Sequence, residues 1–327
     1  MNSTKSILTI GLLVVIVLFP TQLMAGSKLR PQKTNDIISF VGIYAGTGYS
    51  ALLHAIPNTN VLGGGFGNIG VKYKMSTKKH FTFSVGLETM LLNSTSTHDN
   101  FTIYGIYNYN DAIGNSTKMD FQFAFSQYQE QHNQWSINMP ILFGKDFKHS
   151  YFGLGANIRY NILGSYNTNT MLTTSATDPE LIDNLENIPT HHISSQLIGS
   201  AGNLSMGVEV MGMAEFGITL NNLTRKKEME YKSIYKRKDI SYQLSLFAAY
   251  GIFSVTSSAR DQRLVNFDNA IHDGNNIIVP EKDIFHISNS SIFSINEAKD
   301  KAINSLTVGV KFIVSFQLNK ICRTCIY

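Results

Sequence analysis

The last strand-like stretch of the chain, residues 306–318, reads LTVGVKFIVSFQL and alternates between apolar and small or polar residues. Its apolar face carries Leu306, Val308, Val310, Phe312, Val314, Phe316 and Leu318. Its other face carries Thr307, Gly309, Lys311, Ser315 and Gln317. A strand that alternates for about 10 residues, tilted by about 40° and rising about 3.3 Å per residue, crosses the apolar layer of an outer membrane. The stretch therefore predicts a strand of a transmembrane β-barrel.

Seven earlier segments repeat this period of two, which predicts an all-β, up-and-down antiparallel barrel of eight strands. They are residues 38–50, 66–75, 81–92, 134–145, 151–162, 204–220 and 240–253. An even strand number suits a barrel whose two termini lie on the same side of the membrane. Pro140 cannot donate a ladder hydrogen bond, so it predicts a bulge or kink. In residues 204–220 we expect Met206 to face outward with Val208 and Val210.

The connections between these segments alternate in length. Short connections are expected at 76–80, 146–150 and 221–239, and long ones at 51–65, 93–133, 163–203 and 254–305. Short periplasmic turns and long external loops are typical of outer-membrane barrels, whereas a soluble β-sandwich has no reason to sort its connections in this way. The alternation favours the barrel.

Residues 101–110 and 119–129 also have strand character. They predict either an extended hairpin standing above the membrane or two further strands of a ten-stranded barrel. Both alternatives keep the strand number even. We favour eight strands.

The N-terminus has the pattern of a signal peptide: Lys5, an uncharged apolar run and a small-residue exit at Ala25. The expected organisation is a signal peptide at 1–25, a short periplasmic segment at 26–37, the barrel at 38–318 and a periplasmic tail at 319–327. Export predicts an outer-membrane location in a Gram-negative bacterium. Outer-membrane lipid and, during biogenesis, the barrel-assembly machinery are then expected partners. A formal net charge of +4 gives no indication of a nucleic-acid partner.

Five segments resemble the outer-membrane β-barrel proteins of Bacteroidetes, including the PorT-like group. They are VGIYAGTGYS, IGVKYKMSTKKHFTFSVGLET, SINMPILFG, YFGLGANIRY and LTVGVKFIVSFQL. The resemblance implies an eight-stranded barrel and no particular mechanism. The chain looks like an OmpA-like barrel domain without a peptidoglycan-binding domain, because only residues 319–327 follow the last strand.

The inward-facing positions carry three cations and three anions, which predict a lumenal charge network. These residues are Lys72, Glu88, Arg159, Glu209, Glu215 and Lys311. An eight-stranded barrel is just wide enough for side chains, so buried charges in it must pair. A proton path or an ion channel is the functional alternative.

Residues 225–239 carry seven basic and three acidic side chains, more than a turn requires. This segment predicts either a solvated turn or a surface that docks an acidic periplasmic protein or anionic headgroups. The candidate docking residues are Arg225, Lys226, Lys227, Lys236, Arg237 and Lys238.

No motif with diagnostic spacing predicts a catalytic, cofactor or metal site, so we expect no enzyme activity and no cofactor. The candidates in the expected external regions are His54, His98, His132, His191, His192, His272, Asp178 and Glu180. A rim hydrolase would need a serine and a carboxylate beside a histidine such as His132. Cys322 and Cys325 provide only half of a zinc site, and a local disulfide or free thiols are expected.

Three functions therefore remain open. The first is a structural or surface-recognition barrel, which we favour. The second is a component of a secretion or envelope-assembly machine, as the resemblance allows. The third is an outer-membrane hydrolase acting at the barrel rim.

Overall fold

The computed structural model describes residues 37–77, 79–110, 116–147, 149–177, 193–220, 240–255, 257, 263–267, 271–273, 276–278, 285–295 and 301–318. The expected signal peptide, residues 221–239 and both cysteines lie outside this set. No helix within it is long and apolar enough to cross a membrane.

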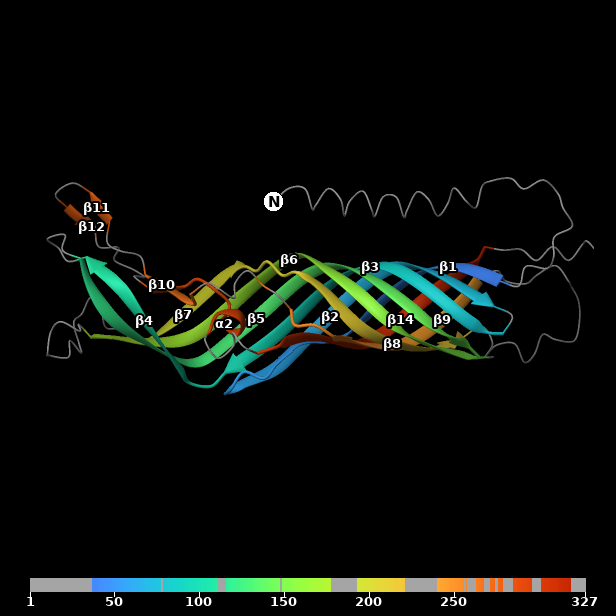
Figure 1. The fold of residues 1–327 in the computed structure, drawn as a ribbon, viewed down its shortest axis with the longest axis horizontal. Helices are drawn as coiled ribbons and strands as arrows, with labels where there is room; N and C mark the ends of the chain where they lie inside the picture. The colour runs from blue at the N-terminus through green and yellow to red at the C-terminus, as the bar shows by residue number, and fades with distance from the viewer. Residues whose placement is uncertain are drawn as a thin grey trace, which may run out of the picture. The chain divides into compact units, whose positions relative to one another are not determined.

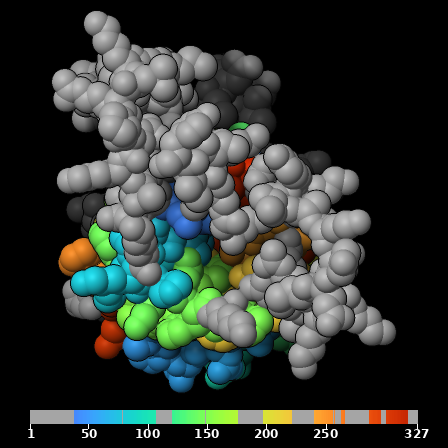
Figure 2. All heavy atoms as spheres, turned by 90° about the vertical axis from the view of Figure 1, so that its right-hand side faces the viewer, coloured from blue at the N-terminus to red at the C-terminus, as the bar shows by residue number. Residues whose placement is uncertain are grey.

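Eight antiparallel strands close into a ring, which confirms the predicted barrel. In ring order they are β1 (Ile37–His54), β2 (Thr59–Thr77), β3 (Phe81–His98), β5 (Ser116–Asp146), β6 (Ser150–Thr177), β8 (Val208–Thr219), β9 (Ile240–Gly251) and β14 (Ile303–Gln317). β14 closes the ring by pairing with β1 from Phe40 and Gln317 to His54 and Ile303. Viewed from the end with the short turns, the colours follow one another around the barrel from blue to red (Figure 2).

The two faces of the ring differ in polarity as the alternation predicts. On β14, Val308, Val310 and Phe312 are exposed on the outside, while Thr307 and Lys311 are buried in the lumen. Every strand of the ring contributes exposed apolar side chains to the outer belt. Backbone polar groups in the belt are satisfied by the closed ladder, as a lipid environment requires.

Beyond the ring, β5 and β6 remain paired with each other as far as Asp120 and Thr177, and extend past the barrel (Figure 1). β4 (Phe101–Asn110) pairs with the far half of β5 and runs in the same direction as β3, so it continues β3 after Asp99 and Asn100. β7 (Ile193–Asn203) continues into β8 along β6 in the same way. The ambiguous segments thus belong to an extended hairpin and not to a ten-stranded ring.

The expectation of loops at 93–133 and 163–203 is therefore largely wrong, since most of these residues extend the barrel strands. Residues 51–65 also form mainly strand, because β1 and β2 are joined by a turn of only four residues, 55–58. We call the paired strand residues beyond the ring the external sheet; they belong to the ends of β3, β5 and β6 and to β4 and β7. Its outward side chains are largely Asn, Gln and Thr, so these strands do not show the apolar alternation of the barrel wall.

The polarity of the wall inverts where the external sheet begins. On the outer face of β5, exposed Trp135 is followed towards the tip by Asn133 and Gln131. On the inner face, polar Asn138 and Ser136 lie in the ring, while Phe125 and Phe121 lie near the tip. The ring is thus built for lipid outside and polar groups inside, and the external sheet for water outside and an apolar core inside.

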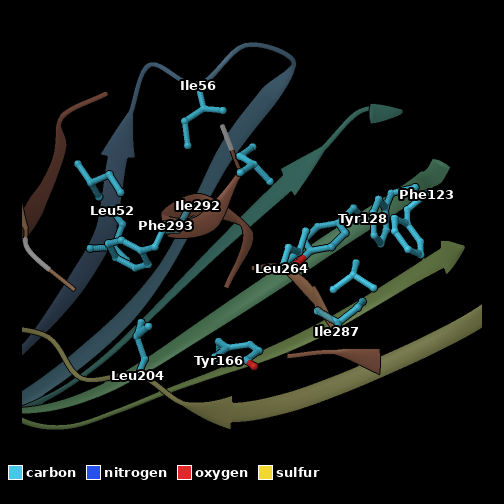
Figure 3. Close-up of a cluster of buried hydrophobic side chains, with 14 of the residues drawn as sticks. Leu52, Ile56, Phe123, Tyr128, Tyr166, Leu204, Leu264, Ile287, Ile292 and Phe293 are labelled. Atoms are coloured by element: carbon cyan, nitrogen blue, oxygen red, sulfur yellow. The ribbon is translucent and has the colours of Figure 1, made fainter. Parts of the chain in front are cut away.

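The long connection from β9 to β14 covers the inner face of the external sheet. It contains β10 (Val265–Phe267) paired with β13 (Phe285–Ile287), β11 (Ile271–Asp273) paired with β12 (Asn276–Ile278), and the short helix α2 (Ser291–Ser294). Ile292 and Phe293 of α2 are fully buried in one cluster with Tyr128 and Tyr166 of the sheet. Figure 3 shows α2 among these side chains. We call this buried cluster, which lies between the external sheet and the connection from β9 to β14, the external core.

Two local predictions need correction. Pro140 causes no bulge: the register between β3 and β5 is unchanged across it, but the ladder pairs opposite Gly86 and Leu87 are missing, because proline has no N–H to donate. The bulges of β5 against β6 lie instead at Ser126/Gln129 and Trp135/Ser136. Met206 does not face outward, because β8 begins only at Val208 and Met206 is buried in the external core.

Candidate functional site

The structure brings all six lumenal charges into three ion pairs inside the ring. Nζ of Lys72 lies 2.6 Å from Glu215, the Arg159 guanidinium lies 3.3 Å from Glu209, and Nζ of Lys311 lies 3.0 Å from Glu88. Each pair joins strands far apart in the sequence. The pairing leaves no lumenal charge of this set without an opposite partner, which offsets the cost of burying it.

Glu88 is the centre of the network. Its carboxylate accepts hydrogen bonds from the Tyr44 hydroxyl at 2.8 Å, Asn68 at 2.9 Å, Asn138 at 3.1 Å and Lys311 at 3.0 Å. Asn138 also accepts a hydrogen bond from Arg159, so the Glu88–Lys311 and Arg159–Glu209 pairs share a bridging amide.

Aromatic rings lie close to two of the lumenal cations, Lys311 and Lys72. Lys311 lies 4.1 Å from the ring centroid of Phe247 and 4.9 Å from that of Tyr44. Lys72 lies 5.3 Å from the Tyr151 ring, whose hydroxyl donates to Glu215. These contacts lower the need of both ammonium groups for water.

Two small cavities lie among the lumenal side chains. The cavity beside Tyr44, Lys72 and Lys311 and a second one beside Arg159 and Gln134 each have a volume of only about 10 Å³. Such a space holds about one water molecule. The geometry therefore suits a rigid plug of paired side chains.

A second polar cluster, which we call the Glu130 anchor, lies in the external core. The Glu130 carboxylate accepts hydrogen bonds from the Ser291 backbone N–H and hydroxyl, both at 2.7 Å, from Tyr128 at 2.8 Å, and from the hydroxyl of Ser290. His132 Nε2 lies 2.6 Å from the same carboxylate. Two strand residues thereby hold α2 and the residue before it against the external sheet.

The electrostatics of the anchor follow from these contacts. Glu130 lies beyond Trp135 and thus outside the lipid-facing part of β5. Burial by itself raises the pKa of Glu130, but His132 and the hydrogen bonds from His132, Ser290 and Ser291 outweigh burial and lower this pKa to about 2. At the tip of β1, burial together with His98 and His132 lowers the pKa of His54 to about 4. Glu130 is therefore an ionised acceptor at neutral pH.

The anchor contains a serine, a histidine and a carboxylate, but not in the geometry of a hydrolase. In a catalytic triad the carboxylate binds Nδ1 of the histidine and the serine binds Nε2. Here Ser290 Oγ and Glu130 both approach Nε2 of His132, while the buried Nδ1 has no hydrogen-bond partner among the described residues. The serine, histidine and carboxylate are also fully buried. The arrangement fixes a segment in place instead of presenting a nucleophile.

The remaining candidates divide into those near the anchor and those outside the described residues. His98 joins the anchor through Ser291 Oγ at 3.1 Å, and its other ring nitrogen lies 3.0 Å from Thr59 Oγ1. His272 is on β11, and its side chain is outside the described set. Outside it too lie Asp178, Glu180, His191, His192, Arg225, Lys226, Lys227, Lys236, Arg237 and Lys238. Among the residues that the structure describes, no group of three His, Cys, Asp or Glu could hold a metal ion.

Replacing Glu130 by alanine is expected to loosen α2 from the external sheet without opening the ring. The change leaves the buried donors of Tyr128, Ser290 and Ser291 without their acceptor, at a cost of about 1–3 kcal/mol for each unsatisfied group. Hydrogen exchange of residues 285–295 should accelerate, whereas exchange in β14 should stay slow. Gln131→Ala, on the outer face of the same strand, is the matched control. Unchanged exchange at 285–295 in Glu130→Ala would show that the anchor holds nothing.

Comparisons with known proteins give no family assignment. No protein-family model and no curated protein matches the chain. A search of solved structures finds Ail, the attachment invasion locus protein of Yersinia pestis, determined in complex with the heparin analogue sucrose octasulfate. The match covers 84% of this chain and 98% of Ail, at 6% sequence identity and a TM-score of 0.20. At these values the similarity carries no argument about activity, and the fold rests on the closed ring described above.

Proposed function

We propose that the chain is an integral outer-membrane protein with a structural or surface-recognition role and no catalytic activity. The ring is the membrane anchor, and the external sheet is the part presented outside the cell. The observation that carries the proposal is the inversion of polarity along β5, which continues a lipid-facing wall into a water-facing sheet with its own core. A sheet held by its own core and by the Glu130 anchor is a rigid surface, as recognition without induced folding requires.

The apolar side chains exposed on the external sheet are its candidate contact residues. Tyr104 and Ile106 are 73% and 60% exposed on β4, and Leu197 is 63% exposed on β7. Exposed aromatic and aliphatic residues on an otherwise polar surface are typical of protein contact sites. The PorT-like resemblance rests on the five segments quoted above, and a role in a secretion machine rests on docking residues in 225–239, which lie outside the described residues. Both stay secondary proposals.

The first test asks whether the protein lies in the outer membrane and whether the barrel lumen is closed to ions. The mature protein should fractionate with outer membranes, migrate differently on gels before and after boiling, and give no conductance steps in planar bilayers. An epitope placed between β4 and β5 should be labelled by antibody on intact cells. Recovery in the soluble periplasmic fraction would refute the membrane assignment. Stable conductance steps would refute the closed lumen.

A further inference from the structure

A groove of about 920 Å³ crosses the outer wall of the barrel at the upper edge of the lipid-facing belt. It spans four adjacent strands, β2, β3, β5 and β6. One ladder row forms its apolar floor: Gly67 pairs with Leu91, Leu91 with Trp135, and Trp135 with Leu163. Leu91, Trp135 and Leu163 are 64%, 41% and 60% exposed.

On β2, the groove is deep because the residues that face outward there, Gly65 and Gly67, have no side chains. A Cβ atom added at Gly67 would meet no atom within 4 Å, and one at Gly65 would meet only the Gly48 carbonyl at 3.7 Å. The groove therefore exists because the outward positions of β2 lack side chains here. It is also continuous with the lipid-facing belt below it, since Ile69 and Val71 of β2 are exposed.

The next outward row towards the tip is polar on β3, β5, β6 and β7. Asn93 pairs with Asn133, Asn133 with Ser165, and Ser165 with Asn203. The two rows are two residues apart, which is about 7 Å along a strand. Asn93 Nδ2 donates to Asn133 Oδ1 at 2.8 Å, and this bond leaves further amide donors and acceptors for a ligand.

We propose that this groove binds one molecule of a membrane amphiphile whose headgroup is uncharged and bears hydroxyl or amide groups. The inference rests on the proposed membrane location. An acyl chain lies along the row Gly67–Leu91–Trp135–Leu163, and the headgroup bonds to the amide row above it. None of the described lining residues is charged, so the site has no side-chain partner for a phosphate or carboxylate headgroup. A volume of about 300–1,000 Å³ is usual for small-molecule sites.

Trp135 allows a direct test because it is the only tryptophan of the chain. The full chain, folded in detergent, is titrated with 9,10-dibromostearoyl monoglyceride, whose bromines quench indole fluorescence on contact. The expected result is saturable quenching at about one monoglyceride per protein. Ionised 9,10-dibromostearate, with the same chain and a charged headgroup, is expected to bind at least tenfold more weakly.

Two matched variants separate a site from the surrounding lipid phase. Gly67→Ile adds a side chain inside the groove, where its Cβ meets no atom within 4 Å, and is expected to weaken saturable quenching at least tenfold. Gly212→Ile places the same side chain on the outer face of β8, where the new Cβ meets only Ile252 at 3.9 Å, and should bind like the parent. Both variants are first checked for the gel shift on boiling.

Each outcome decides a different point. Quenching that rises without saturation, equally in all three proteins, would reduce the groove to ordinary lipid contact and overturn the proposal. Equal binding of the stearate would overturn the assignment of an uncharged headgroup. A protein that shows the gel shift and fractionates with outer membranes but lacks saturable quenching leaves the proposed function intact. Failure of fractionation refutes the proposed function on its own.

Discussion

Replacing Lys311 by methionine is expected to lower the free energy of unfolding of the barrel by about 3–5 kcal/mol, because it leaves the buried Glu88 carboxylate without its cationic partner. Both side chains of this pair are 2% exposed. Tyr44, Asn68 and Asn138 would still donate to Glu88, but no cation would remain within bonding distance of it in the described lumen. The measurement is urea unfolding of the detergent-folded protein, followed by its gel shift.

The double variant Glu88→Gln/Lys311→Met gives the decisive comparison. It removes both charges and keeps an amide for the three neutral donors, so it should cost less than the sum of the two single changes. Lys145→Met, at an exposed position near the turn end of β5, is the control and should change stability by less than about 1 kcal/mol. Strictly additive losses in this cycle would mean that the pair does not act as a unit.

The inward orientation of the six charges could be predicted from period two alone, but their partners could not. Lys72 and Glu215 are 143 residues apart, and Glu88 and Lys311 are 223 residues apart. Which inward residues meet depends on the shear of the closed ring, a property of all eight strands together. Local alternation gives the face of each residue and leaves its height in the barrel undetermined.

The alternation predicted part of the external sheet, the strands at 101–110 and 119–129, but not the extensions of β3 and β6. A lipid-facing strand has apolar outward residues, but beyond Trp135 the outward residues of β5 become Asn and Gln. A signal was present on the opposite face, where Phe121, Phe123 and Phe125 alternate with Gln122, Ala124 and Ser126. A strand whose apolar face switches sides marks the point where the wall leaves the lipid.

The Glu130 anchor was beyond sequence reasoning for another reason. His132 was a candidate, but its neighbours Ser290 and Ser291 lie on a connection about 160 residues away. Neither serine belongs to a motif, and α2 has only four residues. Only the folded external core brings these groups together.

Replacing Val310 by arginine is the second change with a large expected effect, a loss of about 2–4 kcal/mol in the stability of the inserted barrel. Val310 faces outward near the middle of β14 and pairs with Leu246, which is 60% exposed on β9. Val310 lies seven residues from either end of β14, Ile303 and Gln317, so the guanidinium would lie in the apolar belt, too far for easy escape to water. The measurement is the fraction of protein in outer membranes that shows the gel shift on boiling.

A substitution on the lumenal face shows whether the loss is due to contact with lipid or to any change in the barrel wall. Ser84→Thr adds one methyl group beside the cavity of about 10 Å³ that Ser84 lines, so it should change stability by less than about 1.5 kcal/mol. Leu87→Arg, on the outward face of the same strand as Ser84, should behave like Val310→Arg. If the arginine variants insert as well as Ser84→Thr does, the outer belt does not face lipid. The ring would then have to be a soluble barrel whose exposed apolar side chains are covered by another protein surface.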